Sequence, residues 1–364
     1  MRFLELHCDH SILGVNLMNK LTAAILTKKG CPLEIKKLDI PPLLKGQVLV
    51  KILYSGVCRS QLMEVRGERG DDRWIPHMLG HEGSGVVVSV GHGVTKVLPG
   101  DDVILGWIKC DGIEAEPAKY LDGNEIINSG RVSTFSNYSI VSESRLVKKP
   151  ESIAFDVAVL FGCALLTGGG MILNELKPIA NESVIVLGLG GIGLSSVIAL
   201  RSIGINKIIA VDISEKKLEL AKNLGATHTV NSLSSKFYRI VNELTDGGAD
   251  ICVESGGSVE TIELGFSLIK KNGGKLLFAS HPPDGEKIQI LPHELISGKS
   301  ISGSWGGASK PDIDVPHMHT LFSSKNIPLR SLLTKNYHLN QINEALDDLE
   351  SGLIFRPLII MDHT

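Results

Sequence analysis

Runs of apolar residues divide the chain into two parts with different patterns. In the first third, short runs rich in β-branched residues are separated by turns that contain Gly or Pro. Runs of this kind predict strands, and here they cover Leu21–Thr27, Gln47–Tyr54, Ser84–Val90 and Asp102–Leu105. The pattern indicates a small all-β domain.

From about residue 155 to 305, apolar strands alternate with helical stretches. The expected strands are Ser183–Leu187, Ile208–Val211, Asp250–Val253 and Lys275–Ala279, and the helices between them are Ile192–Ser202, Glu215–Leu224, Ser235–Leu244 and Val259–Lys270. Because the strands are almost continuously apolar, we predict a doubly wound parallel sheet with helices on both faces, an α/β fold.

The tail is irregular after Trp305 and then predicts one helix, Leu339–Ser351, and one strand, Pro357–Met361. It shows no core of its own, so we expect it to pack on the first domain. The segment Lys299–Ser304, which precedes this tail, is expected to be an edge strand of the parallel sheet and is apolar at alternate positions. An unpaired edge strand tends to pair with another chain, so this segment fits a homodimer or homotetramer.

Composition narrows the classes of function. The chain has 364 residues, enough for two domains, with 43% hydrophobic and 21% charged residues and a net charge of −3. Charges of both signs are interspersed, and no apolar run approaches the ~20 residues that span a bilayer. We therefore expect neither a nucleic acid nor a membrane as partner.

The first residues do not resemble a secretion signal, because Arg2, Glu5 and Asp9 interrupt any apolar core. We interpret residues 1–20 as an N-terminal extension that is poorly ordered, with Met18 as a possible natural start. The six cysteines are few and widely spaced, which argues against a disulfide framework. A reducing, cytoplasmic location fits best.

One glycine-rich turn carries the signature of a dinucleotide site. It follows the strand Ser183–Leu187, opens a helix and reads Gly188-Leu189-Gly190-Gly191-Ile192-Gly193. Such glycines allow a tight turn and close approach of the backbone to a pyrophosphate at the helix N-terminus. Asp212 ends the second strand, roughly 20 residues later, where a ribose-binding acid belongs. A carboxylate there favours NAD over NADP, and Lys217 could reach the ribose beside it.

Three segments hold candidate metal ligands, namely Cys58, His81 and Cys163. Two thiolates and one imidazole with an open fourth position form a catalytic zinc arrangement. The ligands are far apart in the sequence, so each could also be a buried cysteine or a loop histidine.

At these residues the chain resembles the medium-chain zinc-dependent alcohol dehydrogenases, from about Leu21 to Ile360. The shared motifs are Gly56-Val57-Cys58-Arg59-Ser60, Gly80-His81-Glu82, Pro99-Gly100-Asp101, Gly162-Cys163, the glycine turn, Trp305-Gly306-Gly307 and Phe355-Arg356-Pro357. The resemblance implies a GroES-like β-barrel catalytic domain, residues 21–160 completed by 306–364, and a Rossmann domain, residues 161–305, with a cleft between them.

The resemblance also implies roles for individual residues. Cys58, His81 and Cys163 match the zinc ligands, and Glu82 matches a carboxylate that can approach the metal or act as a hydrogen-bonding neighbour. Ser60 matches the hydroxyl that takes the alcohol proton. For the cofactor, Arg59 and Arg356 match the pyrophosphate-binding pair, Thr167 lies near the nicotinamide, and the backbone of Ala279, Ser280 and His281 meets the carboxamide.

Departures from the family pattern concern the second, structural zinc and the surroundings of the catalytic one. The structural lobe keeps only Cys110, so we expect one zinc ion per subunit. Gln61 stands where the family usually has an Asp that hydrogen-bonds the zinc-bound imidazole, and we expect its amide oxygen to accept that bond. Met63 replaces a proton-relay His of other members.

The leading interpretation is a zinc-dependent oxidoreductase that moves a hydride between NAD(H) and an alcohol or carbonyl substrate. The alternatives are a zinc-free quinone or enoyl reductase, and a protein that binds the nucleotide without catalysis. Met63, Trp107 and Phe135 are the substrate-pocket candidates, with Trp305 as a further one. Secondary alcohols, polyols and sugar-like substrates all remain open.

Overall fold

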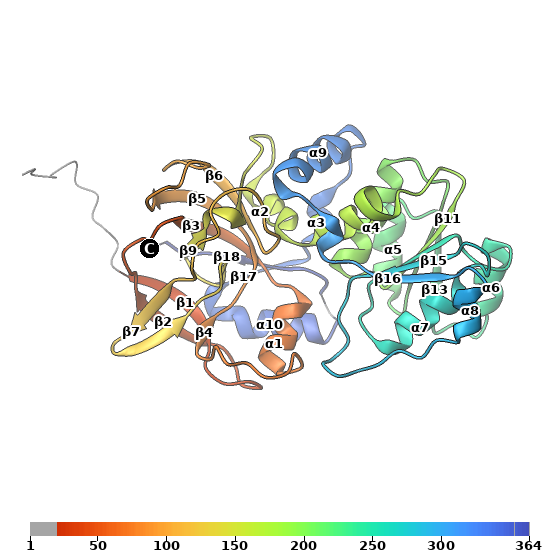
Figure 1. Cartoon of the computed structure of the whole chain (residues 1–364), viewed down its shortest axis with the longest axis horizontal. Coiled ribbons are helices and arrows are strands. Elements are labelled where there is room, and N and C mark those ends of the chain that lie inside the picture. Colours follow the sequence, from red (N-terminus) through yellow and green to blue (C-terminus); the bar gives the residue numbers. More distant parts are fainter. Residues whose placement is uncertain (1–19, 353, 364) are drawn as a thin grey trace, which may run out of the picture.

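A computed structural model of the chain describes residues 20–352 and 354–363 and shows two lobes side by side (Figure 1). One lobe holds the all-β part with the chain's last strands, and the other holds the parallel sheet. Within the described residues, no single helix is long and apolar enough to cross a membrane, although one bent pair passes that test by length and composition.

The first lobe contains a closed barrel and a larger sheet. The barrel has the order β1-β2-β7-β8-β4, formed by Lys20–Leu26, Glu34–Asp39, Lys119–Asp122, Glu125–Asn128 and His77–Met78. The larger sheet has the order β10-β6-β5-β3-β18-β17, with β9 also paired to β3. Its strands are β3 Gln47–Gly56, β5 Glu82–Val90, β6 Asp102–Gly106, β9 Tyr138–Ser142, β10 Leu146–Lys148, β17 Lys335–His338 and β18 Pro357–Ile360. The expected all-β domain is therefore present.

The second lobe is the expected doubly wound sheet. Six parallel strands lie in the order β13-β12-β11-β14-β15-β16, so the chain changes direction between β11 and β14. The strands are β11 Ser183–Leu187, β12 Lys207–Asp212, β13 His228–Asn231, β14 Ile251–Glu254, β15 Lys275–Phe278 and β16 Ser300–Gly303. In such sheets, ligands bind beyond the carboxyl ends of the strands at this point of reversal.

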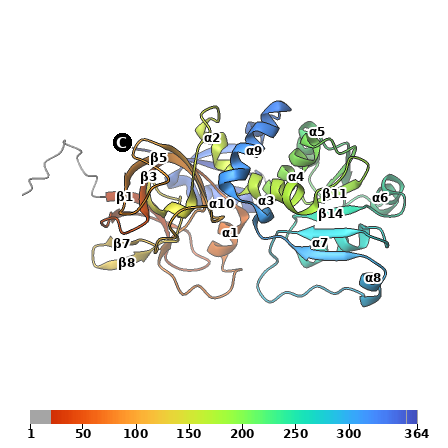
Figure 2. The same ribbon diagram turned by 45° about the horizontal axis from the view of Figure 1, so that its top comes forward.

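Helices cover both faces of the parallel sheet, as Figure 2 shows. They are α4 Gly191–Ser202, α5 Glu215–Leu224, α6 Phe237–Thr245 and α7 Val259–Leu268, whereas the short α8, Pro292–Ile296, buries none of its residues. Two apolar clusters separate on the two sides: Val184 and Val186 of β11 join one, and Ile185 and Leu187 the other. Alternation of side chains along a strand explains this division.

Three further helices lie where the lobes meet or on the first lobe: α1 Arg59–Arg66, α2 Phe155–Ala158 and α3 Ala164–Gly170. Helix α10, Ile342–Glu350, packs on the first lobe, and β18 pairs antiparallel with β3. The tail from β17 onward thus completes the first domain.

Helix α9, Pro311–Ser324, follows the expected boundary at residue 305 and was not predicted from the sequence. Val315, Met318 and Phe322 of this helix join the apolar cluster formed around α4, and the helix also contacts β10 of the first lobe. Pro311 and the internal Pro316 interrupt the polar–apolar pattern of a regular helix. The pattern therefore looked irregular although a helix forms.

Candidate active site

Three loops bring Cys58, His81 and Cys163 together. Cys58 directly precedes α1, His81 lies between β4 and β5, and Cys163 directly precedes α3. Their ligand atoms all lie within 4.8 Å of one another. This separation and the two-sulfur, one-nitrogen donor set fit a tetrahedral zinc ion with one open position.

Electrostatics at this cluster favour a bound cation. The hydrogen bond from Cys163 lowers the pKa of Cys58 well below its usual value, with help from His81 and Arg356. The same bond, together with burial, raises the pKa of Cys163. Nε2 of His81 is buried and has no hydrogen-bond partner among the described residues. A divalent cation would supply both the missing partner and the charge that holds two thiolates together.

Glu82, which follows His81, is fully buried and contacts the guanidinium of Arg356. It does not belong to the three-residue ligand cluster found among the described residues. Burial raises the pKa of Glu82 against the opposing effect of Arg356. The carboxylate of Glu82 therefore lies next to the metal site and forms an ion pair with Arg356. This matches the role of a hydrogen-bonding neighbour, one of the two roles expected for it.

The glycine turn has the geometry of a phosphate-binding turn. Gly188 has a φ of 85°, and a Cβ at Gly193 would lie 1.9 Å from the carbonyl oxygen of Gly188. By contrast, a Cβ at Gly190 would meet no atom within 4 Å, so open space lies beside the N-terminus of α4. Space next to free backbone N–H groups is what a pyrophosphate needs. Leu189 and Ile192 complete the turn.

Asp212 is buried at the end of β12 and is tied to this turn. Its Oδ2 accepts a hydrogen bond of 2.7 Å from the N–H of Leu189, and its Oδ1 accepts one of 2.9 Å from the N–H of Ser214. The Nζ of Lys217 lies 3.9 Å from Oδ2. The acid thus lies beside the glycine turn, as the expected ribose partner should.

Several expected residues present buried polar atoms without partners among the described residues. These include the hydroxyls of Ser60, Thr167 and Ser280 and the Nε of Arg356. Arg356 lies beside the glycine turn, since a Cβ at Gly191 would be 2.9 Å from its Nη1. Arg59, the other expected pyrophosphate partner, is exposed at the start of α1.

Sequence reasoning missed Glu254, which ends β14 at the point where the sheet reverses. Its Oε1 accepts hydrogen bonds from Gly256, Gly257 and Thr261, whereas its buried Oε2 has no partner among the described residues. Burial raises the pKa of this carboxyl group. An acid at the carboxyl end of an otherwise apolar strand was the signal that could have identified it.

Similarity to known proteins decides between the interpretations of this site. Residues 44–151 match the family described as alcohol dehydrogenase GroES-like domain, and residues 191–324 match the zinc-binding dehydrogenase family. The chain is 33% identical over 368 residues to an S-(hydroxymethyl)glutathione dehydrogenase of Photobacterium damsela subsp. piscicida, covering 93% of this chain and 99% of that protein.

Solved structures of similar fold point to the same family. A benzyl alcohol dehydrogenase from Acinetobacter calcoaceticus has a TM-score of 0.85 and 30% identity, covering 95% of this chain and all of the other. A zinc-binding-domain alcohol dehydrogenase from Burkholderia ambifaria has a TM-score of 0.87 and 28% identity, covering 94% and 99%. The chain belongs to the zinc-dependent medium-chain alcohol dehydrogenase family. It is a zinc-dependent oxidoreductase, and the zinc-free alternative is not favoured.

Within this family pattern, the structure departs from the sequence expectation at Gln61. The amide oxygen of Gln61 accepts a hydrogen bond of 3.1 Å from the N–H of Cys58, and its Nε2, not its oxygen, faces Nδ1 of His81. The expectation that the oxygen accepts from the imidazole is therefore not met. The reason is local, because α1 begins here and its first N–H groups need an acceptor.

The segment around Cys110 is held by ion pairs and hydrogen bonds. Nζ of Lys96 lies 3.1 Å from Sγ of Cys110 and 2.6 Å from the carboxylate of Asp312 on α9. Glu143 accepts three backbone hydrogen bonds from this region, which come from Thr95, Lys96 and Ile113. Burial raises the pKa of Cys110.

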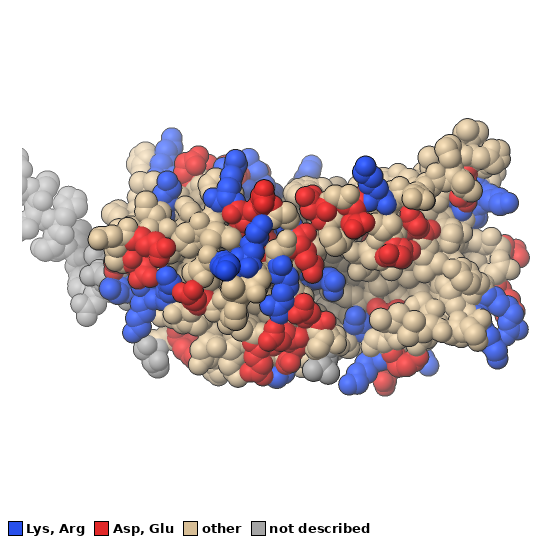
Figure 3. All heavy atoms as spheres, turned by 90° about the horizontal axis from the view of Figure 1, so that it is seen from below, with Lys and Arg blue, Asp and Glu red and all other residues tan. Residues whose placement is uncertain are grey.

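The substrate-pocket candidates occupy different environments. Phe135 is fully buried next to Gly80, and Met63 is buried on α1. Trp107 is partly buried, and Trp305 is 74% exposed. Figure 3 shows a hollow where the two lobes meet, with acidic and basic side chains interspersed on the same face.

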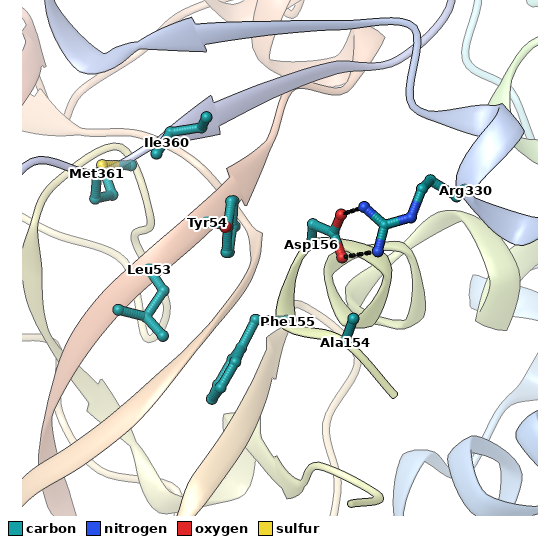
Figure 4. A pocket seen from close by; sticks show the side chains of 8 residues that line it. All are labelled: Leu53, Tyr54, Ala154, Phe155, Asp156, Arg330, Ile360 and Met361. Atoms are coloured by element: carbon teal, nitrogen blue, oxygen red, sulfur yellow. Dashed lines mark hydrogen bonds and ion pairs between the residues drawn. The ribbon is translucent and has the colours of Figure 1, made fainter. Parts of the chain in front are cut away.

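A surface pocket of about 540 Å³ lies apart from these residues, between β3, β18 and α2 (Figure 4). Its rim carries the ion pair of Asp156 and Arg330, and Tyr54, Phe155 and Met361 line it. None of the expected zinc, cofactor or substrate residues lines this pocket. We therefore assign it no part in the oxidoreductase site.

Proposed function

We propose that this oxidoreductase is an NAD-dependent alcohol dehydrogenase that holds one zinc ion per subunit at Cys58, His81 and Cys163. One observation carries the proposal. Of the eleven buried side-chain atoms without a partner among the described residues, seven gather at the metal cluster and the nucleotide crevice: those of Ser60, His81, Glu82, Thr167, Glu254, Ser280 and Arg356. Native proteins rarely leave buried polar groups unpaired, so a concentration of them marks ligand positions.

Zinc and the hydroxyl of Ser60 would have separate roles in removing the proton from the alcohol. When bound, zinc acts as a Lewis acid that lowers the pKa of a substrate hydroxyl. Ser60 is the second residue of α1, two residues after Cys58, and its buried Oγ has no partner among the described residues, so it can accept the substrate proton. Because Met63 carries no proton, the proton then leaves through water or a ribose hydroxyl.

The nucleotide is held by the turn and by charge. The N–H groups at the start of α4 and the Nη1 side of Arg356 receive the pyrophosphate. The carboxylate of Asp212 accepts the ribose hydroxyls and repels a 2′-phosphate, which selects NAD over NADP. The hydroxyl of Thr167, one turn after Cys163 on α3, is buried without a partner among the described residues, which suits the expected place near the nicotinamide.

The substrate is a small alcohol, and a primary one is favoured. The printed names of two relatives, benzyl alcohol dehydrogenase and S-(hydroxymethyl)glutathione dehydrogenase, both specify a substrate with a terminal CH₂OH group. The corresponding aldehyde is the carbonyl partner of the reaction.

A cytoplasmic homodimer or homotetramer is the proposed form. Strand β16 pairs only with β15 among the described strands, and the exposed apolar residues Leu291 and Ile296, at 69% and 82% exposure, precede it in the chain. Such an edge is stabilised by pairing with a second copy. The free cysteines of the described residues suit a reducing compartment.

The test is an activity screen of dialysed protein with primary, secondary and polyhydric alcohols, each with NAD and NADP. We expect nicotinamide reduction with primary alcohols and NAD that disappears after zinc removal and returns after zinc is restored. Absence of reduction with every alcohol by zinc-loaded protein would overturn the proposal.

A further inference from the structure

A proton taken up by the hydroxyl of Ser60 starts from a buried position. The Oγ of Ser60 is buried and has no hydrogen-bond partner among the described residues. Ser60 is the second residue of α1, so the side chains that follow on this helix decide which groups its hydroxyl can reach. Residues four apart on a helix lie on the same face, one turn apart. The residue one turn after Ser60 is Glu64.

The three residues between these two offer no proton acceptor. The amide of Gln61 is engaged on both sides, because its oxygen accepts from the N–H of Cys58 and its Nε2 faces Nδ1 of His81. Leu62 and Met63 are apolar and buried. The single carboxylate of α1 is therefore the nearest side chain along the helix that can accept a proton from the hydroxyl.

Glu64 is placed between the site and the solvent. Its side chain is 30% exposed, and its Oε1 lies 3.3 Å from Nη1 of Arg69, whose side chain is 42% exposed. On the protein side, the charge of Glu64 interacts with those of His81, His77 and Asp72. The carboxylate is thus within electrostatic range of the site and still in contact with bulk water.

These surroundings suit a group that takes up and releases protons. Burial raises the pKa of Glu64 above its usual value, and the charges of Arg69, His81 and His77 oppose this rise while Asp72 adds to it. Burial is the largest of these effects, and the net change is upward. A carboxylate with a raised pKa is a better proton acceptor near neutral pH than an ordinary one, because its pKa lies closer to the operating pH.

His281 is the competing acceptor from the nucleotide domain. It lies in the segment between β15 and α8, and its ring is within electrostatic range of Arg69 and Cys58. Partial burial and the charge of Arg69 lower its pKa. His281 belongs to a different domain from Ser60, whereas α1 holds Glu64 at a fixed place relative to that hydroxyl. The shared helix therefore favours Glu64.

We propose that Glu64 accepts the alcohol proton that Ser60 relays and releases it to the solvent. This inference rests on the proposed function and identifies the terminal proton acceptor of the same site. The Oγ of Ser60 takes the proton of the substrate hydroxyl as it gives its own to the carboxylate, directly or across one water molecule. The resulting carboxylic acid then loses that proton to bulk water. Only protons move in these steps, so they require no oxidant or reductant.

The experiment measures kcat for a primary alcohol between acid and neutral pH with zinc-loaded protein. In the wild type, kcat should fall in acid as Glu64 becomes protonated, because a carboxylic acid no longer accepts the proton. Glu64→Gln should lower kcat at neutral pH by roughly 10²-fold, with little change in KM, and should lose this acid limb. Glu64→Asp should restore much of both. Glu68→Gln, which removes an exposed carboxylate just after α1, is the matched control and should behave as the wild type.

A second measurement does not depend on turnover. Infrared titration of the metal-free protein should show the C=O stretching band of a protonated carboxyl group that persists above the usual pH range of Glu and is missing in Glu64→Gln. Melting curves check that this variant is folded. Arg69→Gln should move both the band and the acid limb of kcat to higher pH, because the guanidinium lowers the pKa of Glu64.

The outcomes separate the acceptor from the proposed function. If alcohols are oxidised and Glu64→Gln keeps the kcat and the pH profile of the wild type, the role of Glu64 is wrong while the proposed function stands. Loss of the acid limb in His281→Gln instead would identify His281 as the acceptor and overturn the inference. If the wild-type enzyme oxidises no alcohol, the proposed function itself fails, and the role of Glu64 fails with it.

Discussion

The guanidinium of Arg356 joins two sites, because one side contacts the Glu82 carboxylate and the other lies beside Gly191 in the glycine turn. Both partners of the ion pair are buried, at 5% exposure for Arg356 and 0% for Glu82. The metal neighbourhood and the nucleotide turn therefore share one cation, which comes from the end of the chain.

Removing one partner of this pair should be costly. We expect Glu82→Ala to lower the free energy of unfolding by about 3 to 5 kcal/mol, since it leaves a buried cation without its partner. Urea unfolding of the metal-free and zinc-loaded forms measures the effect. The control is Glu350→Ala, which breaks the exposed pair with Arg66 and should cost at most about 1 kcal/mol. Equal losses in both variants would contradict this account.

Metal content follows from the ligand cluster. We expect one zinc ion per subunit in dialysed protein, a loss of zinc in Cys163→Ser, and full retention in Cys110→Ser, because Lys96 and backbone oxygens already occupy that thiol. Elemental analysis of the three proteins decides the matter. Two tightly held zinc ions in the wild-type protein would show that the Cys110 lobe also binds metal.

Proton transfer is assigned to Ser60. Ser60→Ala should lower kcat by roughly 10²-fold, the usual scale for a lost proton-transfer group, while zinc content stays intact. Ser136→Ala is the matched control, since its hydroxyl is equally buried and unpartnered but lies on the barrel side. Full activity of Ser60→Ala would show that the proton leaves by another route.

Cofactor choice depends on Asp212. We expect NAD to be favoured over NADP by on the order of a hundredfold in kcat/KM, because the 2′-phosphate would be placed against a buried carboxylate. Asp212→Asn keeps the shape of the side chain without the charge and should narrow the gap. Equal efficiency of the wild-type enzyme with both cofactors would point instead to Lys217 as a phosphate ligand.

Stability should fall in acid partly through Glu143. Burial alone would raise the pKa of this carboxyl group, but three backbone N–H groups outweigh it, so the pKa is lowered on folding. Its contribution is therefore present above the unfolded pKa, near 4.3, and is lost as pH falls through the folded pKa. Melting temperatures from neutral to acid pH should show Glu143→Gln destabilised at pH 7 and approaching the wild type in acid. A constant difference at every pH would exclude this mechanism.

The sequence predicted regular, strongly patterned elements well. The strand Ser183–Leu187 and the helix Glu215–Leu224 have the expected bounds, because continuous apolar runs and helical periodicity leave few alternatives. Strand β13 and helix α9 were missed, since a short half-exposed strand and a helix containing Pro316 have weak patterns.

The sequence predicted which residues belong to the site but not the contacts between their side chains. Resemblance identified the three candidate metal ligands, which the fold then brings together. It could not reveal which atom of Gln61 faces His81, or that Trp107 meets Trp305, because these depend on how side chains from distant segments are packed. Periodicity describes single elements, whereas such contacts join two of them.

The pairing of β18 with β3 has a consequence for synthesis. Leu358 pairs with Gly56, roughly 300 residues earlier, so the barrel domain lacks a strand until almost the whole chain has left the ribosome. At usual translation rates this interval lasts about 15 to 60 s. The strands of the nucleotide domain are consecutive in the chain, so all of them are synthesised before β18. This domain can therefore fold first, and the barrel domain is completed afterwards beside it. A nascent chain stalled before Pro357 should therefore already bind dinucleotide while its other half is still open to proteases.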